Sequence, residues 1–193
     1  SPPPHHSAMQ DPIVVSAWID PPLNVYGTIP SSFRATEVYD LSPDPALPGG
    51  NKLTLRRMTE PYEKVYDLPG NTPADWPKSF DTKKWHFLQA TIAGRRVGAA
   101  AVVARSPKIE LLEGRDDFAL VWDIRVAPQA RRLGVGSALW NAATVWALGA
   151  GLRELLVETQ QINVPACRFY QRRGCTLHHA RFAAYSRNPG EIQ

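Results

Sequence analysis

The distribution of proline is the feature that most constrains how this chain can fold. Ten of its 18 prolines lie within the first 50 of its 193 residues. Because proline lacks a backbone N–H and fixes φ, we expect neither long helices nor interior strands in this part of the chain. Leu23–Thr28 and Ala35–Asp40 could still form short strands. Residues 41–51 have the proline and glycine content of a loop.

The segments that follow are also irregular. Lys52–Met58 alternates in polarity and could be a strand or the start of a helix. Residues 66–80 are again rich in proline, which predicts a loop with helical turns at most.

From Lys84 onward the pattern becomes regular. Residues 84–104, interrupted by Gly94, predict a β-hairpin. Phe118–Val126 predicts a strand, on one face of which we place Leu120, Trp122, Ile124 and Val126. Apolar residues then recur at three- and four-residue steps and predict a helix that ends near Gly151: Val135, Leu139, Ala142, Trp146 and Gly149.

The last part of the chain repeats this alternation. Residues 153–159 predict a strand, 164–173 a helix that ends at Gly174, and 181–186 a further strand. Strands that alternate with helices indicate a layered α/β domain. We expect residues 1–20, with His5 and His6, to be a disordered tail or tag remnant, and 21–193 to be a single domain. Within it we separate a proline-rich half, residues 21–83, from a regular half, residues 84–193.

Composition excludes several classes of protein. Hydrophobic residues make up 44% and charged residues 21%, as in a soluble globular protein. A net charge of +4 without a Lys/Arg-rich run argues against nucleic-acid binding, and the longest purely apolar run is too short to span a membrane. Cys167 and Cys175 have no zinc or disulfide spacing, so we expect no metal site and a cytoplasmic location.

The stretch "RRLGVGS", Arg131–Ser137, lies between the predicted strand and the predicted helix. Gly134 and Gly136 allow a tight turn and a close approach to a ligand. The start of the helix offers unpaired N–H groups to a pyrophosphate, and the arginines add positive charge. The stretch is neither a dinucleotide fingerprint nor a Walker loop. The alternative is an ordinary strand-to-helix turn with solvated arginines.

Two stretches together carry a resemblance. "DIRVAPQARRLGVGSAL" (123–139) and "VETQQINVPACRFYQRRGC" (157–175) contain R-x-x-G-x-G and N-x-x-A-x-x-F-Y-x-x-x-G in this order. They resemble the GNAT N-acetyltransferase superfamily, and the second stretch is most similar to its streptothricin acetyltransferases. Cys175 departs from the phenylalanine usual in the family. The resemblance implies a mixed, mostly antiparallel central sheet flanked by helices and splayed at an acetyl-CoA site.

The resemblance also implies that residues 21–83 are the substrate-side half, that residues 84–193 are the acetyl-CoA-binding half, and which residues bind acetyl-CoA. The backbone of Ile124–Val126 would pair with the pantetheine arm through free N–H and C=O groups, and one N–H would hold the thioester oxygen. The loop at the start of the helix would wrap the pyrophosphate, and Asn163 would lie against the cofactor unless it only caps a helix. The full predicted set is Ile124, Arg125, Val126, Arg131, Arg132, Leu133, Gly134, Val135, Gly136, Ser137 and Asn163.

Three residues are catalytic candidates. The resemblance implies that Tyr170 protonates the CoA thiolate, which a phenol with a pKa of ~10 can do; the alternative is a buried structural tyrosine. Glu158, at the carboxyl end of a predicted strand, could take the proton of the amine or be a structural carboxylate. Asp123 is the rival base, or an anchor for a cationic substrate. We do not expect Cys167 to be a nucleophile, because no histidine lies near it in the sequence.

The resemblance implies acetyl-CoA-dependent acetylation of a primary amine on a small cationic molecule. The first candidate is a streptothricin-type antibiotic, with resistance as the result. The alternatives are another amine, such as a polyamine, an aminoglycoside, a protein N-terminus or a lysine, and a non-catalytic CoA-binding module. A homodimer is compatible with the sequence. Loop carboxylates that could bind the cation are Asp67, Asp75, Asp81, Asp116 and Asp117, and histidines that we expect to be surface or core residues are His86, His178 and His179.

Overall fold

The computed structural model describes residues 10–46 and 50–177. Within them the chain forms two compact units, each of which is described by itself. The first contains the residues up to Ser31 together with Asp67–Leu156, and the second contains Ser32–Tyr66 together with the residues from Val157 onward. These units differ from the two halves expected from the sequence, because the chain leaves the first unit and returns to it.

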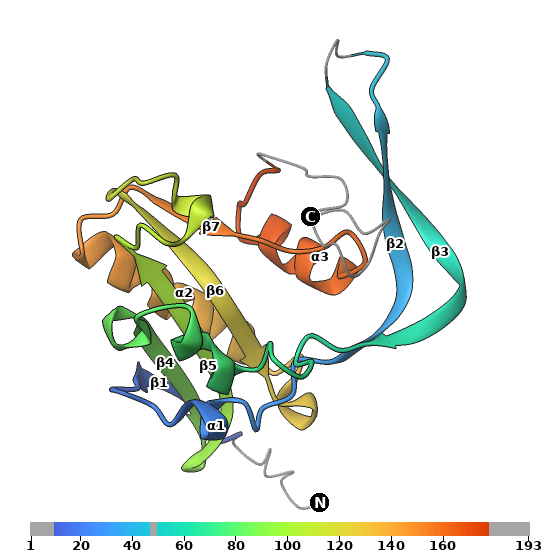
Figure 1. Ribbon diagram of the computed structural model, residues 1–193. Coiled ribbons are helices and arrows are strands. Elements are labelled where there is room, and N and C mark those ends of the chain that lie inside the picture. Colours follow the sequence, from blue (N-terminus) through green and yellow to red (C-terminus); the bar gives the residue numbers. More distant parts are fainter. Residues whose placement is uncertain (1–9, 47–49, 178–193) are drawn as a thin grey trace, which may run out of the picture. The chain divides into compact units, whose positions relative to one another are not determined.

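The first unit is built on a five-stranded sheet with the order β1-β4-β5-β6-β7 (Figure 1). Neighbouring strands from β1 to β6 are antiparallel, which confirms a mostly antiparallel sheet. The hairpin expected around Gly94 is β4 and β5. The strands span Ile13–Ala17 (β1), His86–Ile92 (β4), Arg95–Ala104 (β5), Phe118–Val126 (β6) and Glu154–Val157 (β7).

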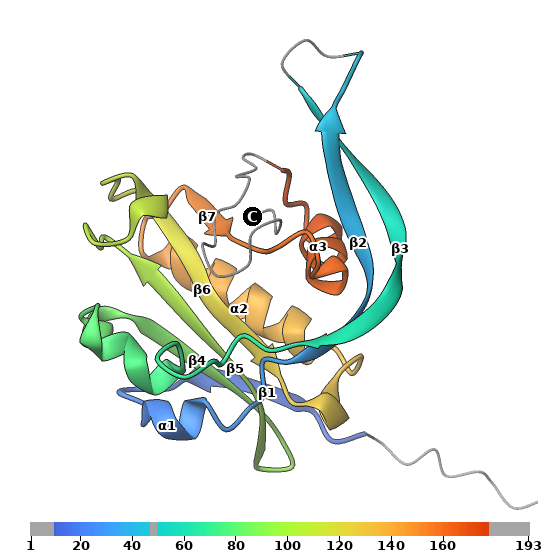
Figure 2. The ribbon, with the colours of Figure 1, turned by 45° about the vertical axis from the view of Figure 1, so that its right-hand side comes forward.

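Helix α2, Val135–Gly149, packs on one face of this sheet, as Figure 2 shows. Gly98 of β5 makes the close approach possible. A Cβ atom at this position would lie 2.7 Å from Cγ1 of Val135 and 3.0 Å from Cδ1 of Leu139. The helix ends where the sequence predicts, since Gly151 adopts a left-handed φ of 76°.

An aromatic cluster covers the other face of the sheet. Its short elements are helix α1 (Leu23–Tyr26) and the 3-10 turns η1 (Pro73–Lys78) and η2 (Thr82–Lys84). Tyr26 makes edge-to-face contacts with Trp76 and Phe87, whose ring centroids lie 5.4 and 5.8 Å away. Two further 3-10 turns, η3 (Glu110–Leu112) and η4 (Pro128–Ala130), flank β6 in the sequence.

A long two-stranded ribbon dominates the second unit. Strand β2, Phe33–Pro43, pairs antiparallel with β3, Asn51–Lys64 (Figures 1 and 2). Helix α3, Val164–Arg172, contacts β2. Ala35, Val38 and Ile162 form a small buried cluster in this unit.

The structure corrects several expectations. Leu23–Thr28 is not a strand, because Leu23–Tyr26 form a helical turn whose Tyr26 is fully buried. The expected tail is wrong at Ile13–Ala17, which pair with β4. The alternation predicted for β6 is wrong at Trp122: a bulge leaves it without a partner in the register with β5, and its ring packs on Trp76.

The remaining expectations have mixed outcomes. Lys52–Met58 is a strand, as part of β3, and residues 66–80 contain only the short turn η1. The strand expected at 181–186 and the two histidines at 178 and 179 lie outside the described residues.

Candidate functional site

The connection between β6 and α2 has the geometry of a phosphate-binding turn. Gly98, Ala99 and Ala100 of β5 pair with residues 126, 125 and 124 of β6. After η4 the backbone is left-handed at Arg132 (φ 64°) and Gly134 (φ 91°), and glycine adopts this conformation without steric cost. The Ala138 N–H donates to the Gly134 carbonyl at 3.0 Å. This bond begins the helical ladder, so the N–H groups of Val135 and Gly136 precede it at the positive end of the helix.

The charges around this turn suit an anion. Arg131, Arg132, Leu133 and Gly134 are exposed, and the Arg131 Nε–H donates to the Val126 carbonyl at 3.3 Å. Val135 is buried against Gly98 and fixes the first turn of α2 on the sheet. The helix start and the arginine side chains thus place positive charge on one short segment. The predicted cofactor residues from Ile124 to Ser137 lie on the end of β6, on this turn and on the first turn of α2.

The second unit carries three further predicted residues, Glu158, Asn163 and Tyr170. Strand β7 ends at Val157, so Glu158 directly follows the strand, and its side chain is half-buried. Asn163 is the N-cap of α3: its Oδ1 accepts a hydrogen bond from the Ala166 N–H at 3.2 Å. The Asn163 Nδ2 also donates to the Tyr66 hydroxyl at 3.2 Å. The capping role is therefore confirmed, whereas a role against the cofactor stays a prediction.

Tyr170 lies on α3 with only 8% of its surface exposed. Its ring packs edge-to-face on Phe169, with 5.3 Å between the centroids. Asn163 and Tyr170 occupy the two ends of one short helix.

Asp123 is part of a buried ion-pair network that sequence reasoning missed. Its two carboxylate oxygens accept hydrogen bonds from Nε and a terminal nitrogen of Arg125, at 2.8 and 2.9 Å. The hydroxyl of Tyr26 donates to the same carboxylate at 2.6 Å. A carboxylate held in this way is poorly placed to accept a proton from an amine. The alternating charges at positions 123 and 125 were the only signal of this network in the sequence.

Most of the candidate carboxylates for a cationic substrate already have cationic partners. Asp67 pairs with Arg125, Asp75 with Lys78, Asp81 with Lys84, and Asp117 with Arg115. Hydrogen bonds from Lys78 and Thr72 lower the pKa of Asp75 to about 2. Asp116 is exposed. These loops do not by themselves form a site for a cation.

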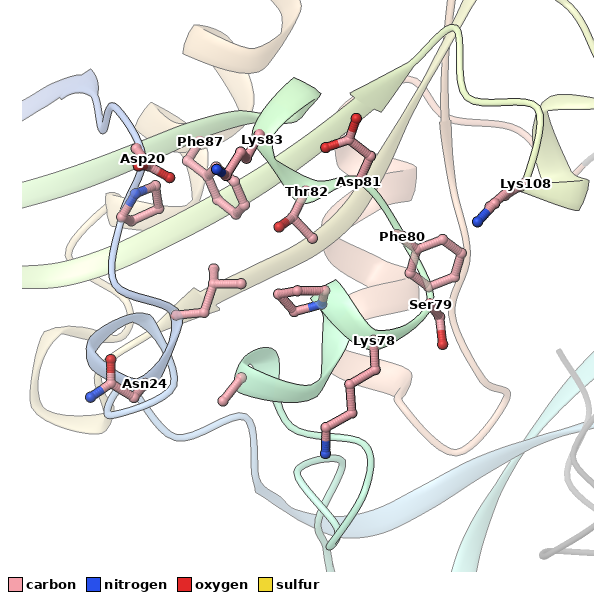
Figure 3. Close-up of a pocket in the computed structure, with 14 residues that line it drawn as sticks. Asp20, Asn24, Lys78, Ser79, Phe80, Asp81, Thr82, Lys83, Phe87 and Lys108 are labelled. Atoms are coloured by element: carbon pink, nitrogen blue, oxygen red, sulfur yellow. The ribbon is translucent and has the colours of Figure 1, made fainter.

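A surface pocket of about 690 Å³ lies among α1, η1 and η2 (Figure 3). Leu23, Phe80 and Phe87 contribute apolar surface to it. Its charged lining residues are three lysines and two aspartates, Lys78, Lys83, Lys108, Asp20 and Asp81. The excess of one positive charge disfavours a cationic ligand. None of the residues predicted for catalysis or for acetyl-CoA lines this pocket.

Burial favours the neutral forms of Cys167 and His86. Burial raises the pKa of the Cys167 thiol to about 11, so it stays protonated at neutral pH. Burial also lowers the pKa of His86, whose ring stacks on Trp146 at 4.5 Å. Among residues 10–46 and 50–177 no group of three His, Cys, Asp or Glu side chains could hold a metal ion. No helix in the same ranges is both long and apolar enough to cross a membrane.

Two curated relatives share part of this sequence. The chain is 35% identical over 119 residues to streptothricin acetyltransferase A of Bacillus subtilis (strain 168), which covers 62% of this chain and 61% of that protein. It is 38% identical over 82 residues to streptothricin acetyltransferase of Escherichia coli, or 42% of this chain and 47% of that one. The chain therefore matches less than two thirds of the length of either relative.

Two solved structures share the fold over nearly the whole chain. A protein described as a streptothricin acetyltransferase of Bacillus anthracis str. Ames, in complex with acetyl coenzyme A, has a TM-score of 0.71 at 22% identity, with 95% of this chain and 94% of that chain covered. A nourseothricin acetyltransferase has a TM-score of 0.72 at 25% identity, covering 93% and 94%. Both confirm the mixed α/β architecture. The sequence model of the acetyltransferase (GNAT) family matches residues 53–175, more than half of the chain, and the chain therefore belongs to the GNAT acetyltransferase family.

Proposed function

We propose that this protein transfers an acetyl group from acetyl-CoA to a primary amine of a small cationic molecule, a streptothricin-type antibiotic. The turn from β6 into α2 is the observation that carries the proposal. Its left-handed residues Arg132 and Gly134 lead directly into the positive end of α2, where backbone N–H groups can bind an anion. The names of the two curated relatives support the choice of antibiotic.

The residues of this turn fit acetyl-CoA. The N–H groups of Val135, Gly136 and Ser137 would bind the pyrophosphate, with Arg131 and Arg132 adding charge. The backbone of Ile124–Val126 would pair with the pantetheine arm, and an N–H near Val126 would hold the thioester oxygen as negative charge develops on it. When bound, acetyl-CoA supplies an activated acetyl thioester.

Two side chains would move protons. Glu158 would accept a proton from the attacking amine, directly or through water, as the new C–N bond forms. Tyr170 would donate its phenolic proton to the sulfur as the C–S bond breaks. We rank Asp123 behind Glu158 as the base, because Arg125 and Tyr26 already bind its oxygens. Direct transfer also leaves no step for Cys167, whose thiol pKa is about 11.

Acetylation would remove the positive charge of the antibiotic amine and so confer resistance. A single domain, which would also include the strand Ile13–Ala17, a cytoplasmic location and a homodimer stay predictions.

Release of free CoA thiol tests the proposal. Acetyl-CoA is incubated with the protein alone and with each of a panel of amines: a streptothricin, a polyamine, an aminoglycoside and an N-terminal peptide. We expect thiol release that depends on the streptothricin. Release with another amine alone would contradict the substrate, and binding of CoA without release for any amine would contradict the activity.

A further inference from the structure

The guanidinium of Arg125 is buried, and each of its N–H donors has an acceptor. Only 2% of the side chain is exposed. Arginine has five N–H donors, and five hydrogen bonds leave this one. Two go to Asp123 (2.8 and 2.9 Å), two to Asp67 (2.9 and 3.3 Å) and one to the Ile29 carbonyl (2.9 Å).

These partners lie where the chain leaves and re-enters the first unit. The chain leaves this unit after Ser31 and returns to it at Asp67. Ile29 is two residues before the exit, and Asp67 is the first residue after the return. The segment between them contains the whole β2–β3 ribbon. One side chain of β6 therefore binds both chain ends of the ribbon, a pair that we call the ribbon root (Ile29 and Asp67).

We call Arg125 together with its partners Asp123, Asp67 and Ile29 the clamp. The charges of these side chains depend on one another. Burial alone would lower the pKa of Arg125, but Asp123 and Asp67 hold it above its usual range, so the guanidinium stays charged. Burial raises the pKa of Tyr26, which keeps the hydroxyl as a donor to Asp123. If one carboxylate is lost, buried N–H donors remain without an acceptor, which is strongly destabilising.

We propose that Arg125 is a positioning residue that fixes the ribbon root on β6. It does so beside Ile124 and Val126, the backbone to which the proposed function assigns the thioester. This inference rests on that proposed function. Since the ribbon belongs to the unit that carries Glu158 and Tyr170, a loose root impairs the transfer step. The contacts proposed for the pyrophosphate at the start of α2, and those of the Arg125 backbone, use none of the side-chain atoms of this network, so acetyl-CoA affinity should be retained.

The variant Asp67→Asn tests the clamp at nearly constant volume, because an amide cannot accept two guanidinium N–H groups as a carboxylate does. Asp40→Asn is the matched control. Asp40 also accepts two bonds from one arginine, Arg56 (2.7 and 3.2 Å), but it lies along the ribbon and not at its root. Arg125→Lys, which keeps the charge but loses the fork of donors, is the second variant.

We expect Asp67→Asn to lower kcat by about 10- to 100-fold, with the dissociation constant of acetyl-CoA unchanged within about twofold. Arg125→Lys should retain part of kcat, and Asp40→Asn all of it. Hydrogen exchange at the amides of 31–33 and 64–68 should be faster in Asp67→Asn and in Arg125→Lys, and unchanged in Asp40→Asn. This readout does not depend on turnover, so it reports on the clamp even if no amine is acetylated and the proposed function fails.

Three results would overturn the inference. Unchanged hydrogen exchange would show that the clamp does not hold the root. Faster exchange with wild-type kcat would make the network structural only. A raised KM for the amine with an unchanged kcat would indicate that Asp67 contacts the substrate itself.

Discussion

Gly98→Ala tests how closely α2 must approach the sheet to build its first turn. The added Cβ would lie 2.7 Å from Cγ1 of Val135 and 3.0 Å from Cδ1 of Leu139, both in the buried core. Because Val135 is the first residue of the helix, the helix start has to move. Overpacking of this kind costs about 1–3 kcal/mol of the free energy of unfolding. For a protein of this size that lowers Tm by roughly 2–12 °C.

The assay compares Gly98→Ala with Gly149→Ala by thermal unfolding and by the KM for acetyl-CoA. Gly149 ends the same helix, and a Cβ there meets no atom within 4 Å. We expect Gly149→Ala to keep the wild-type Tm or to raise it slightly, since alanine favours the helix. Gly98→Ala should lower Tm and raise the KM for acetyl-CoA. An unchanged Tm and KM in Gly98→Ala would refute the reasoning that this glycine seats α2.

Three further predictions concern the proposed chemistry. Tyr170→Phe should lower kcat by roughly 10²-fold or more, with little change in acetyl-CoA affinity, because only proton donation is lost; wild-type turnover would leave Tyr170 a core residue. Glu158→Gln should remove the acidic limb of the pH–rate profile for kcat/KM, and a profile that matches the native one would return the base role to water or Asp123. Cys167→Ala should keep wild-type kcat, since a thiol with a pKa of about 11 is protonated at neutral pH; a loss of activity without a loss of stability would revive a covalent route.

Hydrophobic periodicity predicted the regular half of the fold. A local pattern repeats over many residues in the hairpin of β4 and β5, in strand β6 and in helix α2. Such patterns can be recognised in a single sequence. The glycine turn could also be predicted, because Gly134 and Gly136 lie between a predicted strand and a predicted helix. Helix α1 could not be predicted, since its four residues are too few to show a period and its Tyr26 is fully buried by residues distant in sequence.

Contacts between residues far apart in the chain could not be predicted from the sequence. The bulge at Trp122 reverses the expected alternation of β6, and the sequence of β6 contains no local signal for this bulge. The partners of Arg125 in the ribbon root are 96 and 58 residues away from it in the sequence. The sequence therefore suggested Asp123 as a base or as an anchor for a cationic substrate, whereas in the structure Asp123 forms an ion pair with the buried Arg125. The capping role of Asn163 followed from its place before a helix and is confirmed by its bond to the Ala166 N–H, whereas its role against the cofactor stays a prediction.

The most direct test of the proposed function identifies the product. The protein is incubated with acetyl-CoA and a streptothricin, and the antibiotic is analysed by tandem mass spectrometry. We predict one added acetyl group, placed by fragmentation on a primary amine, with an equal amount of CoA thiol released. If the antibiotic is recovered unmodified although the protein stays folded throughout the assay, the proposed function is contradicted. Acetylation of the antibiotic on an oxygen atom would also contradict it.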